Sequence, residues 1–298
     1  MELVATKDNV RLDIYLSSET DISRSKIQKL IKQGKILVND KEVSSSYTVK
    51  LNDNIVINDE LDFDIEVVPE NIPINVVYED EYLLVVNKES GMVVHPAPGN
   101  YTGTLVNALL YRFGKEKTKK LRPGIVHRID KDTSGVMVVA KDDKTLELLS
   151  NMIKEKKVKR TYYALVDGII PHSTGTIDAP IGRDINNREK MAVTDINSKD
   201  AITHFTVLKR FKNTNQTLIE CNLDTGRTHQ IRVHLSYIGY PIYNDPVYGK
   251  RKETTSFGQF LHSKKISFNH PITGKLIEIE TDLPKEFKDY LEEIDIHE

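Results

Sequence analysis

Hydrophobic positions in the first part of the chain predict a short helix followed by a hairpin. Ser23 is a candidate N-cap for this helix, and Gly34 stands where a left-handed residue would end it. Between them, the apolar residues that share one helical face are Ile27, Leu30 and Ile31. In residues 35–43, apolar and β-branched residues flank the turn-forming pair Asn39-Asp40, which predicts strand, turn and strand.

Beyond a linker marked by Pro69 and Pro73, short apolar segments alternate with helical segments without a regular repeat. The segments with the length and composition of strands are 82–86, 136–140, 161–166 and 217–223. Helical spacing of apolar residues predicts one helix behind Asp142 and another that ends at Gly239. This order favours an α+β fold with a mostly antiparallel, mixed sheet over a doubly wound fold. We therefore expect a small α+β domain and a larger α+β domain, over residues 1–70 and 71–298.

Length and composition are those of a folded protein. The chain has 298 residues, of which 39% are hydrophobic and 29% charged, which excludes a disordered chain. A single cysteine, Cys221, cannot form an internal disulfide, and no basic-then-apolar leader opens the sequence, so we expect a cytoplasmic protein. The apolar runs fall well short of the roughly 20 residues that span a bilayer, which predicts no membrane segment. Nothing in the sequence requires more than a monomer.

The net charge of −2 hides an uneven distribution of charge along the chain. Lysine and arginine gather in residues 24–35, 115–131 and 154–160, whereas acidic residues gather in residues 53–66 and 286–298. Segregation of this kind suggests one basic face that could follow a phosphate backbone. The alternative is that each run only forms a solvated helix face.

Residues 11–43 contain several segments that resemble the S4 RNA-binding domain, which has an αL-like fold. The matching segments are Arg11-Leu12-Asp13, Ser23-Arg24-Ser25, Leu30-Ile31 with Gly34, and Val38-Asn39 before Val43. The resemblance implies RNA binding but no reaction, and the basic residues expected to contact RNA are Arg24, Lys26, Lys29 and Lys32. The alternative is a small α+β domain with a basic surface and another function.

Motifs for bound cofactors and metals are absent from the sequence. The dinucleotide-binding glycine pattern and the phosphate-binding GxxxxGK[ST] loop do not occur. The histidines are scattered, and the spacing of His229 and His234 does not place them on one face of a helix, so no zinc-type set is expected. Cys221 alternates with apolar neighbours, which favours a buried structural role over a nucleophile. We expect neither a cofactor nor a metal.

The most informative segment is the polar stretch 123–136. It places His, Arg, two Asp, Thr and Ser between two apolar strands, and Gly135 follows them. Polar groups packed between strands are costly unless they form hydrogen bonds, which indicates a shaped loop at the mouth of a sheet, where sites are often built. The alternative is a turn whose Asp and Thr side chains only cap backbone N–H groups.

This stretch resembles the HRLDxxTSG signature of the RluA-type pseudouridine synthases. The matching residues are His127-Arg128-Ile129-Asp130 and, after two further residues, Thr133-Ser134-Gly135. Further matches follow in the family's order: Asn87-Lys88, Val94-His95-Pro96, Arg160-Thr161-Tyr162, Gly226-Arg227-Thr228-His229-Gln230-Ile231-Arg232, Gly239-Tyr240-Pro241-Ile242, and Asp245 with Tyr248-Gly249. Two departures are Ile129, where the family commonly has Leu, and Glu89-Ser90, where it often has Pro and a small residue.

The resemblance implies a cofactor-free isomerisation of uridine to pseudouridine in structured RNA. Asp130 is the implied catalytic residue, and Arg128 is implied to help displace the target nucleotide. Tyr162 would stack on the extruded uracil and handle the proton lost from the base, while Arg232 would pair with Asp130 and hold it ionised. Other residues expected to contact the RNA are His127, Thr133, Arg227 and His229. Whether Asp130 adds covalently or removes a sugar proton stays open.

The S4-like and synthase-like segments together imply a bacterial enzyme that acts on large-subunit ribosomal RNA, with transfer RNA as the alternative substrate. Two other functions fit parts of the sequence. One is an RNA-binding assembly factor with an idle larger domain, against which the intact Asp130, Tyr162 and Arg232 argue. The other is a hydrolase that uses His127 or His229 with a carboxylate, but a nucleophile motif such as GxSxG is missing.

Overall fold

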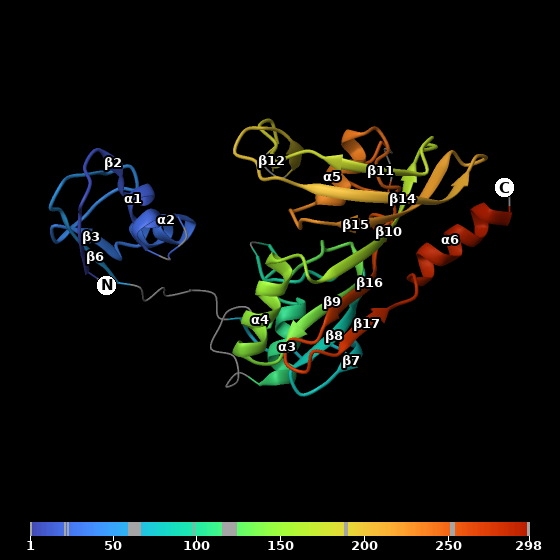
Figure 1. The fold of residues 1–298 in the computed structure, drawn as a ribbon, viewed down its shortest axis with the longest axis horizontal. Coiled ribbons are helices and arrows are strands. Elements are labelled where there is room, and N and C mark those ends of the chain that lie inside the picture. The colour runs from blue at the N-terminus through green and yellow to red at the C-terminus, as the bar shows by residue number, and fades with distance from the viewer. Residues whose placement is uncertain are drawn as a thin grey trace. The chain divides into compact units, whose positions relative to one another are not determined.

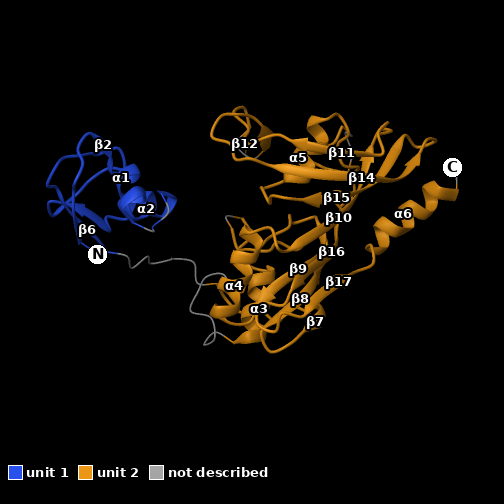
Figure 2. Ribbon diagram, in the orientation of Figure 1, with its two compact units in different colours: residues 1–66 blue, residues 67–298 orange. Residues whose placement is uncertain are grey.

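A computed structural model of the chain describes residues 2–20, 22, 24–58, 67–97, 99–114, 124–187, 190–250 and 254–296. The chain divides into two units, residues 1–66 and 67–298, each with its own hydrophobic core (Figure 2). Ser23, the predicted N-cap, and the lysine-rich residues 115–123 lie outside the described residues. In the part of the chain that is described, no helix is long and apolar enough to cross a bilayer.

The first unit packs two helices against a small sheet (Figure 1). Its helices are α1 (Leu12–Glu19) and α2 (Arg24–Lys32). Its strands are β1 (Glu2–Val4), β2 (Val10–Arg11), β3 (Ile36–Val38), β4 (Lys41–Glu42), β5 (Thr48–Val49) and β6 (Asn54–Ile57). The main sheet has the order β1-β6-β3-β4, and β2 pairs separately with β5. The core of the unit includes Leu12, Leu16, Leu30, Ile36 and Ile55.

The helix and the hairpin predicted from the hydrophobic pattern are both confirmed. Helix α2 ends at Lys32, shortly before Gly34, whose φ of 68° a glycine adopts at low cost. Asn39 and Asp40 join β3 to β4 with φ values of 50° and 61°. Two left-handed residues in succession form the tight turn that matches the twist of a hairpin. The residues that α2 buries are Ile27, Leu30 and Ile31.

Asp13 makes a buried polar contact between the two helices of the first unit. Its side chain is fully buried and accepts hydrogen bonds from Arg11 at 3.1 Å, Arg24 at 3.0 Å and Gln28 at 2.6 Å. Burial opposes the charge of this carboxylate, but the three donors outweigh burial and lower its pKa to about 2. Asp13 therefore fixes the first turns of α2 against α1.

The second unit is built on one large sheet with four helices in its described residues. The helices are α3 (Leu105–Phe113), α4 (Asp143–Lys154), α5 (Gln230–Tyr237) and α6 (Lys285–Ile296). The strands are β7 (Asn75–Glu79), β8 (Leu83–Lys88), β9 (Ser134–Ala140), β10 (Lys159–Asp167), β11 (Thr174–Asp178), β12 (Ile181–Arg183), β13 (Met191–Val193), β14 (Ile202–Phe211), β15 (Gln216–Leu223), β16 (Leu261–Asn269) and β17 (Leu276–Glu280).

The strands of the large sheet have the order β11-β14-β15-β10-β16-β9-β8-β7, with β17 paired to β16. Adjacent strands are antiparallel except β16 and β9, which run parallel. The predicted α+β fold with a mostly antiparallel, mixed sheet is confirmed. In Figure 1, β7, β8 and β9 lie with α3 and α4, whereas β11, β14 and β15 lie with α5. Strands β10 and β16 join these two halves.

Both faces of the central strands are buried, which explains why their sequences are continuously apolar. Leu84 and Val86 of β8 belong to one core cluster, and Leu83 and Val85 belong to another. Successive side chains of a strand point to opposite faces, so a strand covered on both sides needs apolar residues at every position. The runs predicted as strands at residues 82–86 and 136–140 are β8 and β9.

Candidate active site

The polar loop of residues 124–133 enters β9, and a close contact with β16 fixes this entry. Gly135 has a φ of 115° and lies beside Ser263 in the parallel pairing of β9 and β16. A Cβ at Gly135 would lie 2.2 Å from the carbonyl oxygen of Ser263, closer than real Cβ atoms approach. Only glycine therefore fits at the point where the loop becomes a strand.

Lys88, at the end of β8, ties this loop to the segment that follows β8. Its ammonium is buried and donates hydrogen bonds of 2.8 Å to the carbonyl oxygens of Glu89, Met92 and Lys131. Burial lowers the pKa of Lys88 to about 7, against the opposing effect of nearby carboxylates. One side chain thus holds two loop segments in a fixed position.

A cavity of about 560 Å³ opens beside the polar loop. Its walls come from the loop, from β10, from the end of α4 and from residues 223–232, which lead from β15 into α5. The predicted site residues that line it are His127, Arg128, Asp130, Thr133, Tyr162, Arg227, His229 and Arg232. A larger cavity of about 1230 Å³ beside α6 contains none of the predicted site residues.

Asp130 is held by an arginine that is itself held by a second aspartate. Oδ2 of Asp130 lies 3.0 Å from Nη1 of Arg232. The other two nitrogens of this guanidinium donate to both oxygens of Asp245, at 2.7 and 2.9 Å. Asp245 is buried and also accepts hydrogen bonds from the backbone N–H groups of Val247 and Tyr248. Of the two carboxylates, only Asp130 lines the cavity.

The charges in this arrangement support one another. Burial opposes the charge of Arg232, but hydrogen bonds to Asp245 and the charge of Asp130 raise the pKa of the guanidinium. Burial likewise opposes ionisation of Asp245, but Arg232 lowers the pKa of that carboxyl. A bidentate arginine–carboxylate pair is strong and geometrically specific. The site therefore keeps a fixed cation beside Asp130.

His229 lies near the carboxylate oxygen of Asp130 that does not contact Arg232. It stands at the start of α5 in a left-handed conformation with a φ of 56°. Its Nε2 lies 4.0 Å from Oδ1 of Asp130, and its Nδ1 lies 2.8 Å from the hydroxyl of Tyr248. Burial lowers the pKa of His229 despite the nearby carboxylate. The ring of Tyr248 also lies under Arg232, with 5.1 Å between Cζ and the ring centroid, so one tyrosine contacts both neighbours of Asp130.

Tyr162 reaches the cavity from β10. Its side chain is buried, and its backbone pairs with Cys221 of β15 and Ser263 of β16. The register with β16 shifts between Thr161 and Tyr162 because β16 has the extra residue Lys264 there, whereas the pairing of Tyr162 with β15 is regular. Burial raises the pKa of the Tyr162 phenol, so the ring is neutral near pH 7. Tyr162 presents a flat, uncharged aromatic surface to the cavity.

His127 lies in the wall of the cavity, and one of its ring nitrogens already has a hydrogen-bond partner. Its Nε2 accepts a hydrogen bond of 3.2 Å from the backbone N–H of Val138. Burial and, secondarily, the cation of Arg160 lower the pKa of this imidazole to about 3. Because its lone pair is occupied and its basicity is low, His127 is a poor general base. This geometry argues against a hydrolase that uses His127 as its general base.

The other predicted contacts in this unit differ in how accessible they are. Arg128 is exposed and directly precedes the buried Ile129. Thr133 is buried, and its hydroxyl accepts a hydrogen bond of 3.0 Å from Gln259. Arg227 is partly exposed and donates to the carbonyl oxygen of Asp200 at 2.9 Å. Arg128 is thus the most exposed of these three predicted contacts.

Gln230 organises the segment that leads into α5. Its side-chain oxygen accepts hydrogen bonds from the hydroxyl of Thr225 at 2.8 Å and the N–H of Arg227 at 2.9 Å. Its side-chain nitrogen donates to the carbonyl oxygen of Ile202 at 3.0 Å and contacts the hydroxyl of Thr203 at 3.1 Å. The wall that carries Arg227 and His229 is thereby anchored to β14.

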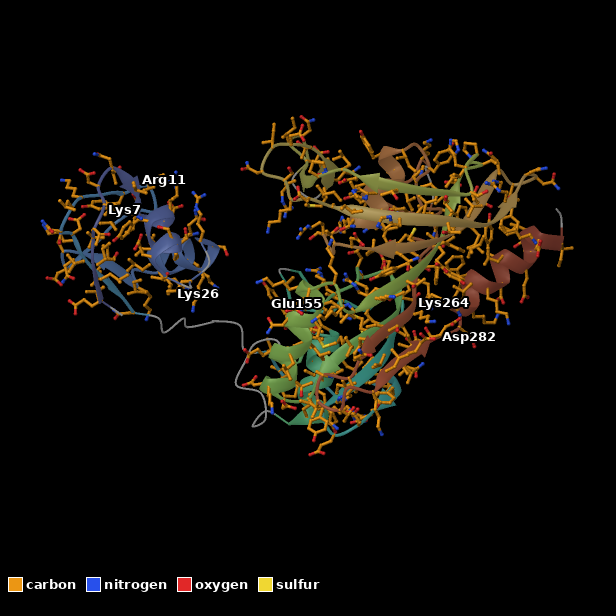
Figure 3. All side chains as sticks on the ribbon, in the orientation of Figure 1. Lys7, Arg11, Lys26, Glu155, Lys264 and Asp282 are labelled. Atoms are coloured by element: carbon orange, nitrogen blue, oxygen red, sulfur yellow. The ribbon has the colours of Figure 1, made fainter. Side chains whose placement is uncertain are left out.

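The predicted basic contacts of the first unit lie on α2, on which Figure 3 labels Lys26. Arg24 is half exposed and forms an ion pair of 2.9 Å with the buried Asp13. Lys29 and Lys32 are exposed, and Lys26 is partly exposed. Helix α2 therefore presents several positive charges to solvent.

Several residues without a predicted role take part in the site or its support, and three of them are buried charged residues: Lys88, Arg160 and Asp245. All three lie within segments that the sequence shares with the synthase family, and this position in a motif was their only signal. Their residue types predict exposed positions instead, because Lys, Arg and Asp are seldom buried unless they are paired.

Comparison with known protein families identifies the family of the chain and supports the interpretation of its fold. Residues 82–237 match the sequence model of the RNA pseudouridylate synthase family, and residues 10–55 match the S4 domain. The chain belongs to the RNA pseudouridine synthase family and carries an S4 domain, as the sequence predicts. The predicted enzyme class is confirmed.

Relatives cover nearly the whole chain. An uncharacterized RNA pseudouridine synthase of Bacillus subtilis (strain 168), YlyB, is 47% identical over 95% of this chain and 94% of its own length. Ribosomal large subunit pseudouridine synthase D of Zymomonas mobilis is 43% identical over 93% of this chain and 92% of its own length. The structure of human RNA pseudouridylate synthase domain containing 1 matches with a TM-score of 0.58 and 26% identity, over 76% of this chain and 96% of that one.

Proposed function

We propose that this chain isomerises uridine to pseudouridine in large-subunit ribosomal RNA, and that Asp130 starts the reaction. The observation that carries the proposal is the position of the Asp130 carboxylate, which lines the cavity 3.0 Å from the guanidinium of Arg232. The bidentate contact with Asp245 fixes Arg232, and Arg232 in turn fixes Asp130. A reacting group held in one geometry has part of its entropy cost removed before the substrate binds.

The reaction exchanges one glycosidic bond for another within a single nucleotide. The bond between ribose C1′ and uracil N1 breaks, the base turns, and a bond forms between C1′ and uracil C5. C5 loses a proton and N1 gains one, so atoms and electrons balance without a co-reactant. Asp130 supplies the group that starts this sequence, either by attack on the nucleotide or by removal of a sugar proton.

The target base must leave its stack before it can reach Asp130. Extrusion costs roughly a few kcal/mol, which contacts in the pocket have to offset. Stacking of the uracil on Tyr162 would contribute about 1–3 kcal/mol. The exposed Arg128 lies close in sequence to Asp130 and is available to contact the RNA that the base leaves. The cavity, at about 560 Å³, is within the size range of pockets that hold small ligands, and a single nucleotide is of that class.

The substrate assignment rests on relatives and on the S4 domain. Relatives from Zymomonas mobilis and Neisseria meningitidis are named ribosomal large subunit pseudouridine synthase D. The S4 domain and the basic surface of α2 support binding to a structured RNA. We expect a cytoplasmic enzyme, because ribosomal RNA is the proposed substrate. We expect it to act as a monomer, and without a cofactor because no electron or group enters or leaves in the isomerisation.

Incubation with unmodified transcripts tests the proposed activity and the proposed substrate together. Transcripts of large-subunit ribosomal RNA, small-subunit ribosomal RNA and transfer RNA are treated with the purified protein, and pseudouridine is mapped at single-nucleotide resolution. We expect pseudouridine at one or a few positions of the large-subunit transcript only. Modification of transfer RNA alone would show that transfer RNA, and not ribosomal RNA, is the substrate. Modification of no transcript would refute the proposed activity.

A further inference from the structure

A buried cation without a counter-ion faces the cavity from β10. Arg160 is only 8% exposed, lines the cavity, and lies two residues before Tyr162 on the same face of the strand. Among the described residues, no carboxylate forms an ion pair with its guanidinium, and its Nε has no hydrogen-bond partner. A guanidinium keeps its charge in proteins, so burial without a partner is costly.

A second donor without an acceptor lies in the same cavity wall. His127 is 9% exposed, and the N–H of Val138 donates to its Nε2. A backbone N–H can only donate, so the proton of the neutral ring is on Nδ1. Within the described ranges, Nδ1 has no hydrogen-bond partner. Arg160 and His127 line the same cavity, and the positive charge of Arg160 contributes to the lowered pKa of His127.

The residues around Arg160 leave space for its guanidinium, and exposed lysines line the same cavity nearer the surface. A Cβ at Gly226 would lie 3.1 Å from Nη1 of Arg160, so glycine at this position gives the guanidinium space. Lys154 and Lys156 are exposed and also line the cavity. They flank Glu155, which Figure 3 labels at the end of α4. The basic run at residues 154–160 thus passes from exposed lysines to a buried arginine.

We propose that Arg160 and the Nδ1–H of His127 form a subsite for a backbone phosphate of the RNA, at or beside the target nucleotide. The inference rests on the proposed function, because it takes RNA as the ligand. A phosphate oxygen accepts hydrogen bonds from both donors and neutralises the guanidinium. A uracil carbonyl would accept the hydrogen bonds but leave the buried charge uncompensated. Two residues along a strand span about 7 Å, so the phosphate would lie near a base stacked on Tyr162.

Salt-dependent binding tests the subsite in a pair of matched variants. Lys159→Gln removes one positive charge from an exposed side chain next to Arg160, and Arg160→Gln removes one from the buried side chain. Kd is measured at several salt concentrations for a fragment of the transcript that the wild-type enzyme modifies. Arg160→Gln should raise Kd about tenfold and flatten the slope of log K against log salt by about 0.7 to 0.9, the value of one phosphate contact. Lys159→Gln should change both much less.

The conservative variant separates charge from packing. Arg160→Lys keeps the positive charge but loses the planar donor geometry, so it should restore the salt slope while recovering only part of the affinity. A folded Arg160→Gln variant with wild-type Kd and slope would overturn the subsite. So would an Arg160→Lys variant with the slope of Arg160→Gln, because Arg160 would then act through packing alone.

Chemical changes in the RNA give a second test of the subsite, in the wild-type enzyme and in Arg160→Gln. Each phosphate near the target uridine is replaced in turn by a neutral methylphosphonate. One position should weaken binding about tenfold, and Arg160→Gln should cause no further loss on that RNA, because the two changes remove the same contact. Additive losses at every position, or no sensitive position on an RNA that is modified, would refute the subsite. Failure of the wild-type enzyme to modify any RNA would instead refute the proposed function.

Discussion

Asp130 and Asp245 are the same residue type on the same guanidinium, yet their surroundings give them different roles. Asp245 is buried and uses both oxygens on Arg232, and one of them also accepts from two backbone N–H groups. Asp130 uses only Oδ2 on Arg232, and its Oδ1 lies 4.0 Å from His229 in the wall of the cavity. Asp130 alone has an oxygen available for a substrate, and Asp245 sets the position of the cation.

Asp245→Asn tests whether Arg232 has to be anchored for the reaction. Asparagine keeps the shape but removes the charge that fixes the guanidinium, so the single-turnover rate should fall while Kd for RNA stays within about twofold. Loss of one partner of a buried ion pair costs about 3–5 kcal/mol, and we expect the lower end because Asp130 still contacts Arg232. Thermal unfolding measures the stability, and Asp245→Ala serves as the severe control. A wild-type rate in Asp245→Asn would show that the anchor is dispensable.

Residue pattern alone did not predict the contact between Asp130 and Arg232, which are separated by 102 positions in the sequence. The pair was expected from the resemblance to a family, since local periodicity carries no information about which distant segments meet. Lys88 and Arg160 received no role for a different reason. Their type predicts exposure, and only the structure shows that both are buried.

Elements with strong local signals were predictable from the sequence. Asp142 caps α4 through a hydrogen bond of 2.8 Å from the N–H of Thr145, as its position before an apolar helix suggested. Helix α1 was not predicted, because the buried Asp13 interrupts its apolar face. Strand β16 was not predicted either, since His262 and Ser263 are buried in it through hydrogen bonds to β9. Buried polar residues that form hydrogen bonds with each other interrupt the hydrophobic pattern by which a helix or strand is predicted.

Asp13→Asn should loosen α2 in a way that depends on pH. The pKa of Asp13, about 2, lies below the ordinary value, so its ionised form stabilises the fold at pH values above that ordinary value. The contribution is lost as the pH falls through the folded pKa. Because Arg11 and Arg24 are half exposed, we expect a loss of about 1–2 kcal/mol in the variant at pH 7. Hydrogen exchange of the α2 amides in the full chain measures it.

Two outcomes of that exchange experiment are informative. The variant should lack the loss of protection that the wild type shows between about pH 4 and pH 2, because it has no carboxylate to protonate. Glu19→Gln, which removes an exposed ion pair with Lys7, is the control and should leave α2 unchanged. Equal protection of α2 in Asp13→Asn and the wild type across this range would contradict the assigned role of Asp13.

The charges of the whole molecule are divided between surfaces rather than balanced within each one. The net charge is −2, yet α2 carries Lys26, Lys29 and Lys32 without an acidic residue, and acidic residues predominate in α6. A protein of this kind can bind RNA through one surface although its net charge is negative. The units of the chain have separate cores, so a change on α2 need not disturb the cavity of the second unit.

Neutralisation of the lysines on α2 tests whether this helix binds RNA independently of the cavity in the second unit. The triple variant Lys26→Gln, Lys29→Gln, Lys32→Gln should bind the substrate RNA more weakly and with a shallower salt dependence, because phosphate contacts are lost. The rate at saturating RNA should stay within about twofold of wild type, since the cavity is intact. The matched control neutralises exposed lysines of the second unit outside the cavity: Lys275, Lys285 and Lys288. Equal binding by the two triple variants would show that the lysines of α2 do not contribute to RNA binding.

The role of Asp130 is tested most directly by a single-turnover assay of Asp130→Asn on the transcript that the wild-type enzyme modifies. Asparagine keeps the size of the side chain and its place beside Arg232 but cannot act as a charged nucleophile or base. We expect the variant to bind RNA within a few-fold of the wild-type affinity, to melt within a few degrees of wild type, and to form no detectable pseudouridine. Formation of pseudouridine by this variant at a rate near that of wild type would contradict this role of Asp130.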